Sequence, residues 1–276
     1  MKRLVILIVL VILAAIAGVV ARSASRAELR NLVSHHSSAD VRQEIRQSYE
    51  LSPGARVELS GLNGAVKIET SNTKTAEVYI ERTASSQEAL DARKVTVEAD
   101  GNTLRIRGEK EGGFLSRIFN NSAGERVSLK LPRQISLLAK GVNGAFTSGD
   151  IDGAVEVSGI NGRVQIASTN GRTSFKGING SIVVGVKKID LEGVTLSGVN
   201  GNIELQLAEN LNADFEAKGM NGRVISDLPN VSIDKSGKRG SYWGRIGTGG
   251  IGITAKGING NIRLTRGQEL ASASQN

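Results

Sequence analysis

Residues 159–180 read GINGRVQIASTNGRTSFKGING, with Asn-Gly at Asn161, Asn170 and Asn179, nine residues apart each time. Asn and Gly adopt positive φ at lower cost than other residues, so each pair predicts a tight reversal of the chain. The segments between the reversals are short and alternate apolar with polar residues, which is typical of half-buried strands. The stretch therefore predicts an all-β protein.

The tetrapeptide Gly-x-Asn-Gly, with an aliphatic residue or Met as x, repeats along the C-terminal half of the chain. Its Asn residues are spaced by 18, 18, 21, 21 and 38 residues, and an earlier copy stands at 61–64. Because 38 is twice 19, we expect one further repeat near residue 240 that has lost its signature to an insert. The Asn residues predicted to form structural turns are Asn63, Asn143, Asn161, Asn170, Asn179, Asn200, Asn221 and Asn259.

The apolar positions distinguish a stack of coils from a chain of hairpins. Apolar residues recur three and five positions after each Asn and one position before it, as Val164, Ile166 and Ile160 do around Asn161. Successive hairpins would reflect this pattern at each turn, whereas here it is translated, as in a solenoid. We predict a parallel β-solenoid with two short strands per 18–21-residue coil and stacked Asn amides joined in a ladder. An antiparallel sandwich or meander is the alternative.

The N-terminus predicts export. Lys2 and Arg3 precede an uncharged apolar run from Leu4 to Ala21, 18 residues long. This length fits a retained membrane anchor or a long signal peptide cleaved after Ala21 or Ser25, and a buried core helix is a third interpretation. The leading cations predict a cytoplasmic N-terminus and an exported body.

Composition narrows the functional classes. The chain has 276 residues with 34 Gly, 3 Pro, 3% aromatic residues and no Cys, so disulfides, thiolate chemistry and a lipoprotein cysteine are excluded. The formal charge is +8, but Lys2, Arg3, Arg22 and Arg26 supply four of these charges. The remaining 31 basic and 27 acidic residues give only +4 over the rest of the chain. We therefore predict no nucleic-acid partner.

The body of the chain is interrupted twice, and its ends differ from it in composition. Residues 85–94, SSQEALDARK, predict a short helix or a long loop between two strands. A short helix is also possible on either side of the His-His-Ser-Ser stretch near residue 36. The predicted divisions are a signal-anchor or signal peptide at 1–24, a juxtamembrane linker at 25–47, the solenoid at 48–267 with inserts at 108–126 and 235–250, and a polar tail at 268–276.

These features together resemble the DUF4097 β-strand-repeat family, whose members carry an adhesin label. The resemblance covers about residues 43–267 and includes SYELSPGARVELSGLNGAVKIE, VSLKLPRQISLLAKGVNGAF, NGRVISDLP and the closing GTGGIGITAKGINGNIRL. Each motif alone is weakly specific for the family, whereas the order of the motifs along the chain is more specific. The resemblance implies a right-handed β-solenoid on an exported or membrane-anchored bacterial protein, and it supplies no catalytic residues.

Few residues suggest chemistry. The adjacent His35 and His36 fall in the predicted linker, without ligand spacing to a carboxylate. Asp150 and Asp152 suggest a cation site, but Asp152 is better interpreted as an Asn substitute in a turn. Residues 247–252, GTGGIG, match a dinucleotide fingerprint, yet a strand rather than a helix is predicted to follow. We predict no catalytic residue, metal or cofactor.

Two irregular stretches are candidate contact surfaces. Aromatic residues and Arg are frequent at binding hot spots, but the ends of a solenoid also need apolar caps, so both roles stay open for each stretch. The first places Phe114, Leu115, Ile118 and Phe119 together, and the second places Arg239, Tyr242, Trp243 and Arg245 together.

The function favoured by the sequence is a non-enzymatic envelope scaffold or adhesin-like binding surface. Its partner would be an envelope protein or a surface polymer, and residues 4–21 would contact the membrane. One alternative is an envelope-stress sensor that signals through a retained N-terminal span. A carbohydrate-active β-helix enzyme is a further alternative, although only one Trp is present.

Overall fold

The computed structural model describes residues 41–110, 123–229, 231–235 and 239–267. The compact unit discussed below is Arg42–Asn276. No helix within the described ranges is long and apolar enough to cross a bilayer. The apolar run at 4–21 and the insert residues Phe114 to Phe119 lie outside those ranges, so the predictions made for them stay predictions.

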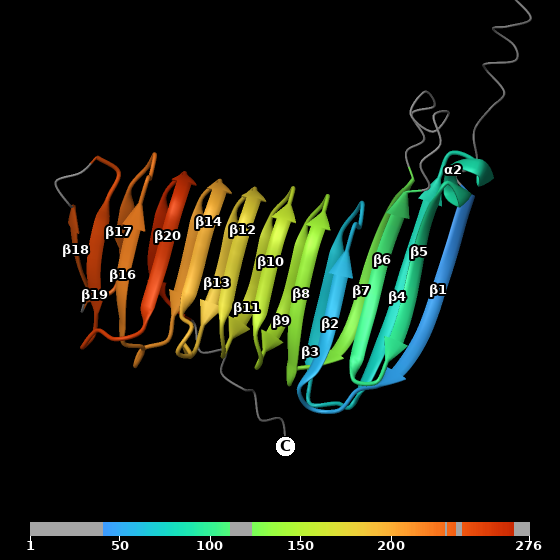
Figure 1. The fold of residues 1–276 in the computed structure, drawn as a ribbon, viewed down its shortest axis with the longest axis horizontal. Helices are drawn as coiled ribbons and strands as arrows, with labels where there is room; N and C mark the ends of the chain where they lie inside the picture. The colour runs from blue at the N-terminus through green and yellow to red at the C-terminus, as the bar shows by residue number, and fades with distance from the viewer. Residues whose placement is uncertain (1–40, 111–122, 230, 236–238, 268–276) are drawn as a thin grey trace, which may run out of the picture. The chain divides into compact units, whose positions relative to one another are not determined.

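The described strands form two large sheets (Figure 1). Sheet A has ten strands, in the spatial order β1 (Val41–Glu50), β4 (Thr75–Ala84), β7 (Gly124–Pro132), β3 (Val66–Ser71), β9 (Phe146–Ile151), β11 (Val164–Thr169), β13 (Ile182–Val186), β15 (Ile203–Leu207), β21 (Ile262–Arg266) and β17 (Val224–Ser226). Sheet B has eleven strands, in the order β18 (Val231–Lys235), β19 (Tyr242–Ile246), β16 (Ala213–Lys218), β20 (Gly252–Asn259), β14 (Val194–Asn200), β12 (Thr173–Asn179), β10 (Val155–Ile160), β8 (Ile135–Val142), β2 (Ala55–Ser60), β6 (Thr103–Lys110) and β5 (Arg93–Asp100).

Consecutive strands of the central region alternate between the sheets, so each strand pairs with the second strand before and after it. Val155 of β10 is the register partner of Leu137 in β8 and of Thr173 in β12, and both pairings are parallel. In sheet A, β11 pairs in parallel with β9 and β13. The all-β prediction is confirmed, and a meander of hairpins is excluded for these strands because hairpin partners would be antiparallel.

We call one strand of each sheet, joined in sequence, a layer. The layers do not stack in chain order. The β2/β3 layer lies between β6/β7 and β8/β9, and the β20/β21 layer lies between β14/β15 and β16/β17. The 38-residue gap therefore does not contain a lost repeat, and that prediction was wrong. Residues 235–250 contain the end of β18 and all of β19, and the chain then returns to insert its last layer one position earlier.

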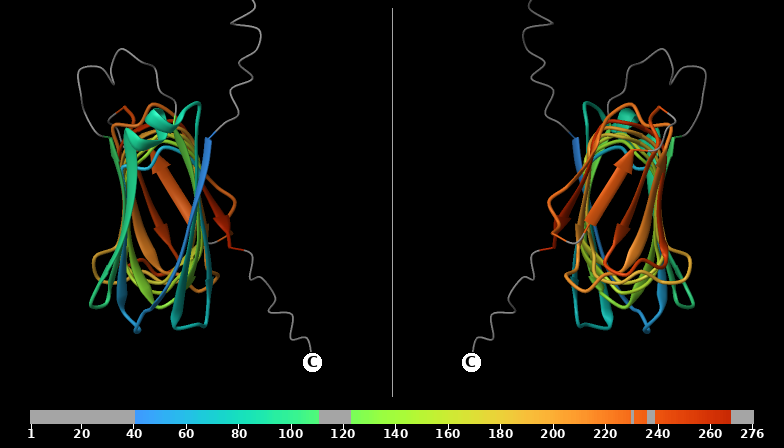
Figure 2. Two further views of the ribbon diagram at one scale, coloured as in Figure 1. Left: turned by 90° about the vertical axis from the view of Figure 1, so that its right-hand side faces the viewer. Right: turned by 90° about the vertical axis from the view of Figure 1, so that its left-hand side faces the viewer.

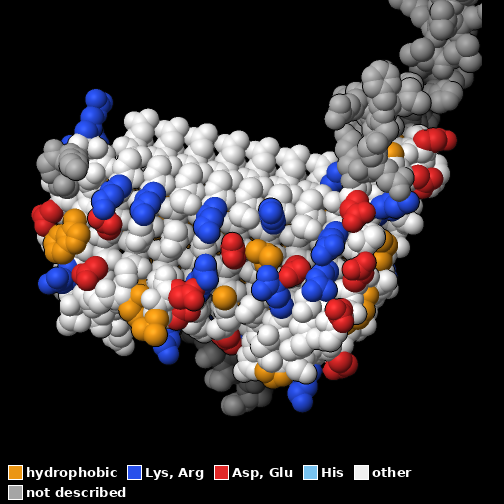
Figure 3. All heavy atoms as spheres, in the orientation of Figure 1, with side chains coloured by type: hydrophobic (Ala, Val, Ile, Leu, Met, Phe, Trp, Pro, Cys, Tyr) orange, Lys and Arg blue, Asp and Glu red, His pale blue; other side chains and the backbone are white. Residues whose placement is uncertain are grey.

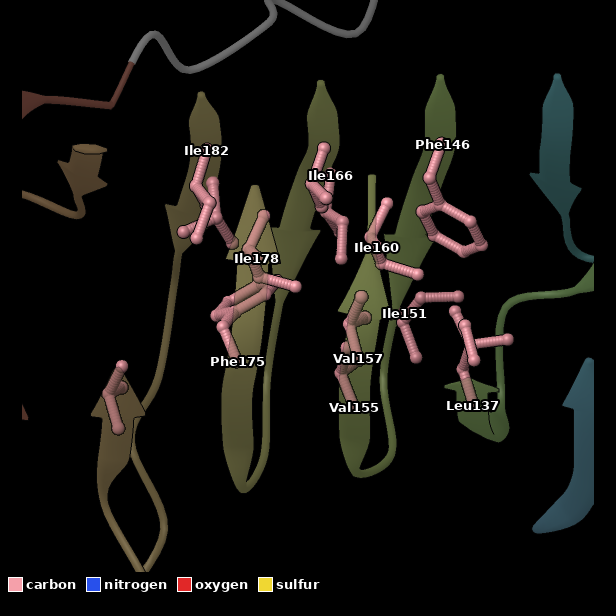
Figure 4. Close-up of a cluster of buried hydrophobic side chains, with 14 of the residues drawn as sticks. Leu137, Phe146, Ile151, Val155, Val157, Ile160, Ile166, Phe175, Ile178 and Ile182 are labelled. Atoms are coloured by element: carbon pink, nitrogen blue, oxygen red, sulfur yellow. The ribbon is translucent and has the colours of Figure 1, made fainter. Parts of the chain in front are cut away.

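The core fills the space between the two sheets (Figure 4). Phe146, Ile166 and Ile182 extend from sheet A toward Val155 and Phe175 of sheet B, and all five are buried. The positions three and five residues after each repeat Asn are buried in β11, β13 and β15, as predicted. Like residues stack on like residues because parallel pairing in register repeats the same face in every layer.

Antiparallel strands lie outside the parallel layers in both sheets at one end, but only in sheet B at the other end, where β17 is the parallel edge of sheet A. At one end β4 pairs with β7 and β5 pairs with β6, while at the other β19 pairs with β16 and β18 pairs with β19. Viewed end-on, the sheets face each other, and strands from the orange to red C-terminal region run obliquely across the space between them (Figure 2).

Of the predicted short helices, one is present in the structure and another is replaced by a strand. The short helix is present as α2 (Gln87–Asp91), and the Ser86 side chain accepts a hydrogen bond from the Ala89 N–H at 3.2 Å. From Val41 onward, however, the predicted linker with its second helix is the strand β1. Ile45 and Tyr49 lie four residues apart and pack against the core. Spacing of four fits one face of a strand as well as one face of a helix, so periodicity could not distinguish them.

Candidate binding surface

An asparagine ladder runs along one corner between the sheets. The Nδ2 of Asn161 donates to Oδ1 of Asn143 at 3.0 Å, and the same bond recurs from layer to layer. The ladder begins at Asn63, whose Nδ2 donates to the Ala123 carbonyl at 2.8 Å. Its spatial order is Asn63, Asn143, Asn161, Asn179, Asn200, Asn259 and Asn221, with bonds of 2.8 to 3.3 Å.

The two glycines of each repeat have separate physical roles. Among the described residues only glycines have positive φ, so the repeat Asn residues do not occupy this region. The first glycine does so, as Gly177 shows with φ of 61°. A Cβ on the second glycine, such as Gly180, would collide with the carbonyl oxygen of Gly162 in the adjacent layer. The Asn is thus required for its amide, and the glycines are required for the turn and the close approach.

A row of cations runs beside this corner on the outer face of sheet B (Figure 3). Each member stands three residues before the repeat Asn or at the equivalent register position. Lys140 is opposite Ser60 and Ser158, and Lys176 is opposite Ser158 and Ser197. We define the lysine row by its full spatial order, Arg107, Ser60, Lys140, Ser158, Lys176, Ser197, Lys256 and Lys218.

The cations of the lysine row are exposed and weakly compensated. Lys218 pairs with Glu216 at 2.5 Å, but no ion pair within the described ranges involves Lys140, Lys176 or Lys256. Acids occur in the neighbouring row, where Glu156 lies two residues before Ser158. The row itself contains no acid, so its positive potential faces solvent. We had not predicted this feature, although the alternation of Ser and Lys three residues before each Asn was a usable signal.

The second predicted contact surface divides into an inward and an outward half. Tyr242 packs against the core, and its hydroxyl donates to the Gly222 carbonyl at 3.0 Å. Trp243 points outward with 44% of its surface exposed. The guanidinium of Arg245 lies 5.6 Å from the Trp243 ring centroid and its Nε is 3.3 Å from Asp214. Arg239 is exposed in the turn before β19. Strand alternation therefore makes Tyr242 part of the cap and leaves Trp243 for contact.

The opposite corner contains a compact charge cluster. The Asn170 Nδ2 donates to Asp152 at 2.6 Å, so Asp152 occupies an amide position in the turn as expected. Arg133 pairs with Asp152 at 3.0 Å, and Asp150 accepts from Ser168 at 2.6 Å and from Lys187 at 3.1 Å. Burial raises the pKa of Asp150, but these two hydrogen bonds outweigh it, so its pKa lies below the ordinary value. The cluster is internally satisfied, and no group of residues suited to a metal ion occurs within the described ranges.

A hollow of about 650 Å³ opens on the outer face of sheet A beside β1. Arg46 lies over the Tyr79 ring at 4.9 Å, and Lys130 pairs with Glu77 at 2.9 Å. A second pair joins Lys67 to Glu69 at 2.7 Å. Because its lysines are neutralised by adjacent acids, this hollow is a weaker candidate for a charged ligand than the lysine row.

The dinucleotide-like stretch behaves as predicted. Residues 247–252 form the turn from β19 into the strand β20, and no helix follows. The N–H groups of Thr248 and Gly250 donate to Asn212 at 2.9 Å and to Asp214 at 3.3 Å. These donors are therefore already used and are not directed at a phosphate. His35 and His36 lie outside the described residues.

Comparison with known proteins gives only distant likeness. No family model matches the chain, and no curated protein does. A "putative cell adhesion protein" from Clostridium sporogenes has 14% identity and a TM-score of 0.39, over 82% of this chain and all of that one. A "putative lipid binding protein" from Parabacteroides distasonis has 13% identity and a TM-score of 0.33, over 81% and 97%. A "putative adhesin" from Bacteroides fragilis has 12% identity and a TM-score of 0.27, over 80% and 97%.

Proposed function

We propose that the protein is a non-enzymatic, exported envelope protein whose body is a right-handed β-solenoid of the DUF4097 type. It acts as a rigid scaffold that presents a binding surface. The observation that carries the proposal is the stacking of side chains in register, with apolar residues along the core, Asn along one corner, and alternating Lys and Ser on the outer face of sheet B. Such rows present the same group at every strand, or at every second strand, with strands about 4.8 Å apart, which suits recognition of an extended partner.

The core supports rigidity. Register partners such as Val164, Ile182 and Ile203 are each no more than 1% exposed. Buried aliphatic stacks of this kind have interior packing densities that resist deformation. A binding face built on them loses little conformational freedom when a partner binds, which favours affinity.

Export and anchoring are proposed from the N-terminus. Lys2 and Arg3 followed by the apolar run at 4–21 are the features of a signal-anchor or signal peptide. The chain contains no Cys, which is compatible with any cellular compartment and therefore neither supports nor opposes export. The partner is an envelope protein or surface polymer, and Trp243 with Arg245 is the proposed first contact site.

Co-sedimentation of the full chain, in a non-ionic detergent, with isolated envelopes of the organism tests this proposal. We expect binding to the envelopes, and Trp243→Ala should weaken it. Leu191→Ala is the matched control, because Leu191 is a large, 93% exposed apolar residue in the turn before β14, which β20 and β16 separate from β19 in sheet B. The proposal is contradicted if the folded full chain does not sediment with envelopes.

A further inference from the structure

We propose that the lysine row and the asparagine ladder form one continuous binding strip for a linear acidic polysaccharide. This inference rests on the proposed function and names the chemistry of its partner. The strip is defined by the repeated sequence Lys/Ser-Gly-x-Asn-Gly, of which residues 176–180, KGING, are one copy. It extends from the β6 layer to the β16 layer on the corner above sheet B.

The strip has a shape suited to a linear polymer. In each layer a glycine separates the cation or serine from the corner, as Gly177 separates Lys176 from Ile178. These glycines are exposed except Gly108 of the β6 layer, which is half-buried beside Arg93, and their backbones approach closely from layer to layer, as Gly198 approaches Gly177. A column without side chains thus lies between the lysines on one side and the Asn amides on the other. Figure 3 shows the cations along one line, with an uncharged band beside them.

The charge spacing selects for a sparsely charged ligand. Cations occupy every second strand from Arg107 to Lys256, so they recur about every 9.6 Å if strands are about 4.8 Å apart. This alternation depends on the layer order, because the inserted β2 places Ser60 between Arg107 and Lys140. A polymer with one carboxylate per disaccharide offers charges at a comparable interval.

The neighbouring groups favour a sugar polymer over other polyanions. Asn side chains donate and accept hydrogen bonds, as sugar hydroxyls do. Trp243 lies on the same outer face of sheet B and offers an aromatic surface to a sugar ring. Duplex DNA carries a negative charge about every 1.7 Å. Such density would be repelled by Glu156 in the adjacent row, which has no ion pair within the described ranges, and the same charge limits binding to anionic membranes.

Exposed lysines are individually weak, so the row must act through multiple contacts. Each solvated charge pair contributes little and is screened by salt. Contacts made along one chain add through the high effective concentration of the remaining sites. Binding is therefore expected to depend on polymer length and to weaken with salt.

The test measures binding of the full chain, in non-ionic detergent, to hyaluronan, which has one carboxylate per disaccharide. Neutral dextran, duplex DNA and anionic phospholipid vesicles are compared at the same ionic strength. The strip variant Lys140→Ser, Lys176→Ser, Lys256→Ser introduces the residue that already stands at the equivalent position of neighbouring layers. The control variant Lys74→Ser, Arg126→Ser, Lys188→Ser removes the same charge from exposed positions outside the strip.

We expect hyaluronan to bind more tightly than the other three probes, and the strip variant to lose about tenfold in affinity. The control variant should lose less than about threefold. Equal losses in the two variants would overturn the inference, as would tighter binding of DNA or vesicles. Envelope binding that is retained by the strip variant would overturn the inference and leave the proposed function intact, whereas no envelope binding by the unmodified chain contradicts the proposed function itself. Thermal unfolding of both variants verifies that they are folded.

Discussion

At the N-terminal end of the two-sheet body, β1, β4 and β5 close the sheets with strands of eight to ten residues, whereas the C-terminal end has β17 with three residues and β18 and β19 with five each. Each end has one layer inserted between two others, but antiparallel strands lie outside it in both sheets at the N-terminal end and only in sheet B at the C-terminal end. They differ in the exposure of large apolar side chains. At the C-terminal end Ile225 is 46% exposed and Trp243 is 44% exposed.

The ends also differ in their charges. Beneath the N-terminal corner, Glu125 is buried and accepts hydrogen bonds from the Arg93 side chain and from the Asn63 N–H, the latter at 2.6 Å. Arg82 is buried beside it and donates to the carbonyls of Leu90 and Arg93. The C-terminal pair, Arg245 with Asp214, is largely exposed. One end is thus sealed by a satisfied polar cluster, and the other is left accessible. We infer that the ends serve stability and contact respectively.

The largest expected effect comes from the sealed end. Glu125→Ala removes the carboxylate that accepts from Arg93 and from the Asn63 N–H, so Arg93 keeps only the Gly61 carbonyl, and breaking a buried ion pair costs about 3–5 kcal/mol. Asp214→Ala at the open end should cost at most about 1 kcal/mol, because its pair with Arg245 is solvated. Urea unfolding of both variants measures the difference. Similar losses would contradict the distinction between the ends.

The next largest difference in stability is expected between a glycine substitution at the N-terminal end and one at the C-terminal end. A Cβ on Gly64 would collide with the Glu125 carbonyl oxygen, and a Cβ on Gly222 would collide with that of Gly260. Gly64→Ala is expected to cost about 3 kcal/mol because layers confine it on both sides. Gly222→Ala should cost only about 1 kcal/mol, since β17 is at the edge of sheet A and can move outward. Thermal unfolding gives the ranking, and a larger loss at Gly222 would reverse it.

Substitutions of the first and last Asn residues of the asparagine ladder should differ less in their cost to stability. Asn63 donates to Ala123 and accepts from Asn143, so Asn63→Ala removes two side-chain hydrogen bonds and should cost about 1–2 kcal/mol. Asn221 donates to Asn259, and no described residue donates to its Oδ1. Asn221→Ala should therefore cost about 0.5 kcal/mol. Equal unfolding free energies for the two variants would show that the ladder end is not closed at Ala123.

Lowering the pH should remove the small part of the protein's stability that comes from the ionised carboxylates of Glu58, near the N-terminal end, and Asp150. Burial raises the pKa of Glu58, but hydrogen bonds from Arg56 and Arg105 outweigh it, and the net pKa is lowered, as it is for Asp150. A lowered folded-state pKa stabilises the protein above the unfolded value, about 4, and this stabilisation is lost as the pH falls through the folded value. Glu58→Gln with Asp150→Asn should flatten the stability curve below about pH 4. An unchanged slope there would contradict the assignment.

The sequence predicted the core and the turns because these depend on local pattern. The positions around each repeat Asn alternate in a fixed register, so Val164 and Ile182 could be placed inward without knowing their neighbours. The distinction between Tyr242 and Trp243 could not be made, because it required knowing that residues 242–246 form a strand. The Ser and Lys three residues before each repeat Asn can be read from the sequence, but the place of Arg107 and the spatial order of the lysine row require the pairing register.

The layer order could not be predicted for a different reason. Every layer that carries the Gly-x-Asn-Gly corner presents nearly the same edge, so any one can stack on any other. The choice between Asn221 and Asn259 as the neighbour of Asn200 is decided by the antiparallel cap. That cap packs β19 on β16 and leaves the space beside β14 for β20. Spacing alone contains no information on this choice.

Disulfide formation tests the layer order most directly, because the chain contains no Cys of its own. Ser197 and Lys256 are register partners, whereas Lys256 separates Ser197 from Lys218. We predict that Ser197→Cys with Lys256→Cys forms a disulfide under mild oxidation, and that Ser197→Cys with Lys218→Cys does not, since two strand spacings of about 9.6 Å exceed disulfide reach. Rapid cross-linking of the second pair without the first would contradict the layer order, and with it the spacing of the lysine row at its C-terminal end.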